Sequence, residues 1–172
     1  MKPRFRAIYE DRSHEQWLRG LADLARIPKR DLTLEPKSES GSGEQWVRER
    51  FPVVLREHRT MKNAQRSLWL VVVADADLQD RGRILREAIA DAQLAPVTPD
   101  DRVLVLLPAR NVETWAWCLL DHSVDETTDY KHEVQHTGMR LRELVAAQWP
   151  TIRSGEPGSL KAARREWERP FS

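Results

Sequence analysis

The feature that most constrains the fold is the apolar run LWLVVVA at residues 68–74. It is rich in β-branched residues and is far shorter than the roughly 20 residues that span a bilayer. A short continuous apolar run predicts a strand buried on both faces, as in the middle of a parallel sheet. The run RVLVLL at 102–107 has the same character. Residues 5–9 and, more weakly, 31–35 are further strand candidates.

Between these runs, apolar residues recur at helical spacing, which predicts helices over 13–25, 44–59, 83–94, 112–120, 133–148 and 160–167. Ser13 and Gln16 form a predicted capping box, and Asn111 is a predicted helix cap. Strands that alternate with helices predict an α/β three-layer sandwich, Rossmann-like, with about four mainly parallel strands. We expect an α/β core over 1–121 and a helical C-terminal extension over 122–172 packed on that core.

The composition excludes several classes of protein. The 172 residues fit one domain. With 28 Lys and Arg against 27 Asp and Glu, the net charge of +1 argues against a polybasic binder. The single cysteine, Cys118, excludes a disulfide framework and a Cys-rich zinc site, and we expect it to serve in packing. Because the first residues lack a long apolar leader, the expected location is the cytoplasm.

Acidic residues follow the predicted strands, where sites form in open parallel sheets. Glu10 ends the first strand, and Asp75 and Asp77 follow the strongest one. Two residues apart in extended backbone, these two aspartates should point the same way. Glu113 lies in the first turn of a later helix. Carboxylates without a nearby histidine or thiolate suit Mg²⁺ or Mn²⁺, and such a site suits phosphodiester chemistry.

Read in order, these motifs resemble a stand-alone Toprim domain. This is the catalytic fold shared by topoisomerases, bacterial primases and nucleases of the overcoming-lysogenization-defect (OLD) type. The matching segments are AIYE ending at Glu10 and VVVADAD ending at Asp77, followed by PARNVETWAWCLLD, DYKH and GSLKAARREWER. The resemblance implies acid–base chemistry at Glu10 and Mg²⁺ binding at Asp75 and Asp77. It implies a metal-ligand role for Glu113 and a catalytic role for Lys131 more weakly.

The implied function is a Mg²⁺-dependent nuclease or nuclease subunit acting on DNA or RNA, in phage defence or nucleic-acid processing. The chain has no Walker A sequence, so an ATPase partner would be a separately encoded chain. Asp11, Arg12 and Ser13 stand where family members commonly carry a glycine soon after the glutamate. The alternative is a non-catalytic Toprim-fold binding or regulatory subunit, and a homo-oligomer stays open for either.

A second motif competes with this interpretation. His132, Glu133 and His136 match H-E-x-x-H, the zinc metallopeptidase pattern, with two ligands one helical turn apart and a glutamate base. Glu143 is a candidate third ligand, although nothing marks it as one. The competing interpretation is a solvated helix with two exposed histidines.

Two further features are open to more than one interpretation, and two isolated histidines carry a simpler prediction. The Asp75–Asp77 motif is also similar to that of haloacid-dehalogenase phosphatases, but it lies mid-chain and Leu78 follows it instead of threonine. The stretch 44–66 has a small excess of basic residues, which either contact phosphates or form a solvated face. The isolated histidines His14 and His58 are predicted to lie on the surface.

Overall fold

The computed structural model describes residues 2–35, 41–61 and 66–172, and in these ranges it contains one four-stranded parallel sheet. The strands are β1 (Arg4–Tyr9), β2 (Leu32–Leu34), β3 (Leu68–Val73) and β4 (Val103–Leu106), in the spatial order β2-β1-β3-β4. The apolar run at 68–74 therefore forms an interior strand, as predicted. Five of the eight predicted loop residues 36–43 lie outside the described ranges.

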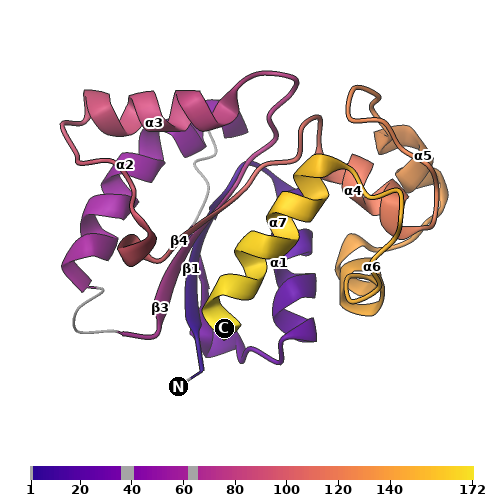
Figure 1. Ribbon diagram of the computed structural model, residues 1–172, viewed down its shortest axis with the longest axis horizontal. Helices are drawn as coiled ribbons and strands as arrows, with labels where there is room; N and C mark the ends of the chain where they lie inside the picture. Colours follow the sequence, from indigo (N-terminus) through magenta and orange to yellow (C-terminus); the bar gives the residue numbers. More distant parts are fainter. Residues whose placement is uncertain (1, 36–40, 62–65) are drawn as a thin grey trace.

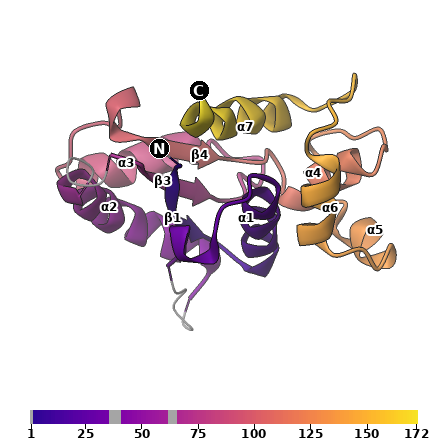
Figure 2. The same cartoon turned by 90° about the horizontal axis from the view of Figure 1, so that it is seen from below.

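Helices cover both faces of the sheet, which confirms the predicted three-layer α/β sandwich (Figure 1). Helices α2 (Gly43–Met61) and α3 (Arg81–Asp91) lie on one face, and α1 (Arg12–Leu24) and α7 (Gly158–Glu168) lie on the other. Helices α4 (Val112–Leu119), α5 (Lys131–His136) and α6 (Leu141–Gln148) gather at the end of the molecule opposite α2 and α3 (Figure 2). In the described ranges, every helix is too short or too polar to cross a lipid bilayer.

Two hydrophobic cores form because side chains alternate across each strand. Val71 and Val73 pack with residues of α1, α4, α6 and α7. Leu70 and Val72, their neighbours in β3, pack with residues of α2 and α3. The fully buried Trp115 belongs to the first core.

The C-terminal helices are part of the first core. The Trp167 ring of α7 stacks on Phe5 of β1 with ring centroids 5.1 Å apart. Helix α6 packs so closely on α1 that a Cβ added at Gly20 would lie 2.7 Å from the Cβ of Val145. Residues beyond 121 therefore complete the layer that covers β1.

Two local predictions were wrong. The expected helix over 133–148 is divided into α5 and α6, because Gly138 between them has φ of 66°, a left-handed conformation that ends a helix. The cap of α1 is Asp11 and not Ser13, because the Asp11 side chain accepts a hydrogen bond from the backbone N–H of His14. Pro52 lies inside α2, which continues through it as one helix.

The prediction that His14 and His58 lie on the surface was also wrong, because both side chains are fully buried. Each continues the apolar stripe of its helix at a spacing of three or four residues. His58 follows Val54 and Leu55 in α2, and its Nε2 lies 2.7 Å from the carbonyl oxygen of Asp101. His14 precedes Trp17 and Leu18 in α1, and its partners lie in the site described next.

Candidate functional site

The site lies at the point where the chain reverses direction across the sheet. From β1 the chain moves to β2 on one side, and then returns to β3 on the other side of β1. Loops diverge at such a switch point and leave a crevice beyond the carboxyl ends of the strands. Tyr9 at the end of β1 is in register with Val73 at the end of β3. Glu10 and Asp75 therefore emerge side by side above this crevice.

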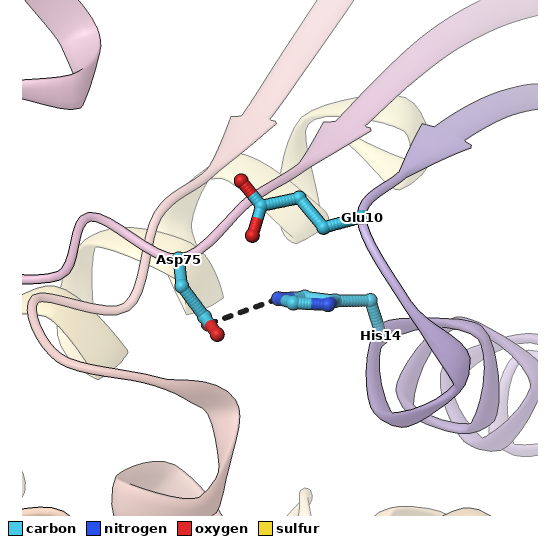
Figure 3. A group of neighbouring side chains, drawn as sticks. All are labelled: Glu10, His14 and Asp75. Carbon is cyan, nitrogen blue, oxygen red and sulfur yellow. Dashed lines mark hydrogen bonds and ion pairs between the residues drawn. The ribbon is translucent and has the colours of Figure 1, made fainter. Parts of the chain in front are cut away.

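Three side chains converge there, as Figure 3 shows. Ligand-type atoms of Glu10, His14 and Asp75 all lie within 4.8 Å of one another. Glu10 and His14 come from the end of β1 and the start of α1, and Asp75 comes from the end of β3. The predicted convergence of Glu10 and Asp75 is present, but the expectation that no histidine lies nearby was wrong.

His14 lies between two carboxylates. Its Nε2 is 2.9 Å from Oδ1 of Asp75, and its Nδ1 is 2.8 Å from Oδ1 of Asp11. The same Asp11 oxygen also accepts the hydrogen bond that caps α1. The N-terminal cap of α1 therefore fixes both the start of the helix and the orientation of the imidazole.

The electrostatics of the cluster follow from burial and from these contacts. Burial raises the pKa of Glu10 to about 7, and the charge of Asp75 adds to the rise while His14 and Arg81 oppose it. Burial alone lowers the pKa of His14, but the hydrogen bonds to Asp11 and Asp75 outweigh it and raise that pKa to about 10. Without a bound cation, the cluster thus holds a cationic imidazole and a Glu10 carboxyl that titrates near neutral pH.

Arg81 and Gly43 hold Glu10 from the other face of the sheet. The guanidinium of Arg81 is buried, donates to the carbonyl oxygen of Asp75 at 3.0 Å, and pairs with Glu10 at 3.4 Å and Glu44 at 2.7 Å. A Cβ added at Gly43 would lie 2.4 Å from the carbonyl oxygen of Glu10. Only glycine lets the first turn of α2 approach the Glu10 backbone this closely.

The first turn of α4 completes the surroundings of Asp75. The Val112 N–H donates to Oδ1 of Asp75 at 3.1 Å, and Asn111 caps the helix, as predicted. Glu113 is buried nearby, accepts a hydrogen bond from the Ser13 hydroxyl at 2.8 Å, and has a pKa that burial raises. Glu113 therefore borders the cluster, but its carboxyl group is bound by the Ser13 hydroxyl.

Asp77 does not point with Asp75, so the argument from extended backbone was wrong. Asp77 and Leu78 have φ of 49° and 62°, in the left-handed region. Their N–H groups donate to the carbonyl oxygens of Arg110 and Ala109, which joins the loops after β3 and β4. The Asp77 side chain is exposed and pairs with Arg110 at 2.9 Å. Its role in metal binding stays a prediction.

The other predicted residues lie on α5. Lys131, His132, Glu133 and His136 are all exposed on this six-residue helix. The rings of His132 and His136 have centroids 4.1 Å apart. In the ranges that the structure describes, they do not join a third side chain in a group compact enough to hold one ion. Lys131 contributes its backbone N–H to Asp129, at the start of α5.

The sequence contained a signal for His14. Residues 14, 17, 18 and 21 form one helical stripe, and the last three are apolar. A histidine on such a stripe is buried and needs polar partners. Asp11, three residues earlier, supplies one partner, whereas Asp75 is distant in the sequence and is brought near only by the fold.

No family model, curated protein or solved structure matches this chain. What can be said of its chemistry therefore rests on the residues and their geometry.

Proposed function

We propose that this protein is a divalent-metal-dependent enzyme that cleaves phosphodiester bonds in DNA or RNA, or the nuclease subunit of a larger complex. The observation that carries the proposal is the meeting of Glu10 and Asp75 at the switch point of a parallel sheet. The order of motifs that resembles a Toprim domain supports the same activity, since both residues fall on its acidic positions.

The residues at the site fit a divalent cation. Oε1 of Glu10 is buried, makes no hydrogen bond in the described part of the chain and lies 3.4 Å from the Arg81 guanidinium, so a cation would share this oxygen with Arg81. Mg²⁺ and Mn²⁺ favour carboxylate oxygens and take their remaining ligands from water and substrate phosphates. A bound ion would supply charge stabilisation to the attacking and leaving oxygens. We assign Asp75 as the principal carboxylate ligand.

Glu10 suits the acid–base role that the resemblance implies. Its pKa of about 7 lies close to neutral pH, where a general acid or base works best. Arg81 and the first turn of α2 hold the side chain in place, so its carboxyl group is fixed beside Asp75.

The nucleic acid would contact the surface beside α1 rather than the basic stretch of α2. In that stretch Arg50 pairs with Glu35, and Arg59 binds Asp101 and two carbonyl oxygens, so these side chains stabilise the fold. A hollow of about 560 Å³ next to the site is lined by Arg12, Ser13, Gln16, Arg140 and Leu141. Arg12 and Arg140 are exposed there and are suited to phosphate contacts.

The test is cleavage of plasmid DNA and of RNA by the purified chain with Mg²⁺ or Mn²⁺. We expect Asp75→Ala to lower the rate by about 100-fold or more, since loss of the ligand removes the ion's charge stabilisation. Asp91→Ala, at the exposed end of α3, is the matched control and should retain the full rate. Equal cleavage by Asp75→Ala and the control would refute the assignment.

A non-catalytic subunit is the second candidate, and one observation favours it. Oδ1 of Asp75 already accepts hydrogen bonds from His14 and Val112, and Asp77 is paired with Arg110. Binding of nucleic acid without cleavage under either metal, and with any cognate ATPase added, would support this candidate. Cleavage that starts only with the ATPase would identify a catalytic subunit.

A further inference from the structure

The surroundings of His14 match those of a metal-binding histidine. Histidine ligands almost always donate their second ring N–H to a carboxylate, a carbonyl or water, which fixes the tautomer and orients the ring. Here Asp11 lies 2.8 Å from Nδ1, and the opposite nitrogen, Nε2, faces Asp75 and Glu10 (Figure 3). The imidazole is fully buried, and its orientation is determined at both ends.

From this geometry we infer that Nε2 of His14 is itself a metal ligand, oriented by Asp11, so that the site binds a divalent transition ion in preference to Mg²⁺. This inference rests on the proposed metal site and specifies its ion. Asp75 and His14 form the ligand pair, and Glu10 lies within reach of the same ion. Imidazole nitrogen suits transition ions, whereas Mg²⁺ favours oxygen ligands only.

Three contacts support an ion at this position. Nε2 of His14 and Oδ1 of Asp75 are 2.9 Å apart, a spacing that two ligands of one ion adopt. Oε1 of Glu10 is buried and makes no hydrogen bond in the described residues; its one ion pair there, with the Arg81 guanidinium, is long, at 3.4 Å. The Val112 N–H also holds Oδ1 of Asp75, so the carboxylate is oriented before an ion arrives.

Binding through Nε2 requires that this nitrogen carry no proton. The incoming ion therefore displaces the Nε2 proton to solvent, and its two positive charges replace the single charge of the imidazolium between Asp75 and Glu10. Asp11 keeps the hydrogen bond from Nδ1, so the ring stays in position. The Nε2–H bond is the only covalent bond of the protein that breaks, and its electron pair stays on Nε2 and binds the ion.

The experiment titrates the full chain with Mn²⁺ alone and records pulsed electron paramagnetic resonance, which detects ¹⁴N bound to the ion. We expect a ¹⁴N signal in the wild type that is lost in His14→Gln, with an affinity for Mn²⁺ at least about tenfold weaker. Asp11→Asn keeps the ligand but weakens its orientation, so we expect an affinity loss of about tenfold with the ¹⁴N signal retained. We also expect Mg²⁺ in hundredfold excess to leave most of the Mn²⁺ bound.

Controls separate this inference from the proposed function. His132→Gln, an exposed histidine on α5, should keep both the affinity and the ¹⁴N signal. Tight Mn²⁺ binding without ¹⁴N coupling in the wild type would overturn the inference and leave an oxygen-only metal site standing. An absence of Mn²⁺ and Mg²⁺ binding would overturn both. If His14→Gln does not fold, the wild-type spectrum and Asp11→Asn still decide the matter.

Discussion

Two regions of this molecule combine histidine with acidic residues, and they differ in how the residues meet. In α5, His132, Glu133 and His136 follow a known sequence motif, yet all three are exposed on a helix of six residues. At the switch point, Glu10, His14 and Asp75 match no histidine motif, yet they form a compact, largely buried cluster. The spacing of a sequence motif places side chains on one face of a helix. A buried polar cluster also needs residues from other elements, which only the fold brings together.

The burial of each region determines what its residues do. The charges of the switch-point cluster are held away from water, so their mutual interactions are strong and their pKa values shift. The α5 residues are surrounded by solvent, which screens their interactions. Mutations in the first region should therefore change stability and metal binding, and mutations in the second should change neither.

The largest expected effect is on stability, from His14→Ala. This change leaves the carboxylates of Asp11 and Asp75 without their shared cation and empties a buried position. Removal of one partner from a buried ion pair costs about 3–5 kcal/mol, and we expect a loss of this size in urea unfolding at pH 7 without metal. A loss of less than about 1 kcal/mol would show that the imidazole is not the ionic centre of the cluster.

The pH dependence of the free energy of unfolding tests the same contact of His14 with Asp11 and Asp75. The folded-state pKa of His14 is raised from 6.5 to about 10, so its stabilising effect is complete below pH 6.5. It is lost as the pH rises toward 10, because the imidazole then loses its proton in the folded state too. The wild type should lose stability over this interval relative to His14→Ala, which lacks the titrating group.

Glu10→Gln should change the free energy of unfolding by a smaller amount and in the opposite direction, as a gain in stability. The pKa of Glu10 is raised from 4.5 to about 7, so ionisation of the folded protein costs stability as the pH rises through this range. Glutamine does not ionise, so the variant should be more stable than the wild type by about 1–3 kcal/mol at pH 8. At pH 4 the two proteins should be equally stable. Urea unfolding at both pH values tests the sign, and a variant less stable at pH 8 would contradict it.

Much of the fold could be predicted from the sequence, because strands such as β3 are marked by their own continuous apolar runs. The strand-end positions of Glu10 and Asp75 followed directly from those strands. The division at Gly138 was missed because apolar spacing continues on both sides of the glycine. The inward position of His14 was missed because one of its partners, Asp75, is adjacent only in the folded protein.

The two aspartates after β3 show, within one loop, a second feature that the sequence alone did not predict. The prediction that both side chains point the same way assumed extended backbone. Instead, the Asp77 backbone adopts a left-handed conformation, and its side chain pairs with Arg110. We therefore expect Asp77→Ala to reduce Mn²⁺ affinity and cleavage by less than about tenfold, well below the effect of Asp75→Ala. Isothermal titration with Mn²⁺ gives the comparison. A loss as large as that of Asp75→Ala would mean that Asp77 leaves Arg110 to bind the ion.

The smallest effect is expected from the double variant His132→Ala/His136→Ala in α5. Both rings are exposed, and substitutions of this kind usually change the free energy of unfolding by no more than about 0.5 kcal/mol. Mn²⁺ affinity and cleavage should match the wild type, since neither residue reaches the switch-point cluster. The measurement that decides is metal content by mass spectrometry after purification without chelator, together with urea unfolding. Stoichiometric zinc in the wild type that disappears in the double variant would instead favour a zinc peptidase site in α5.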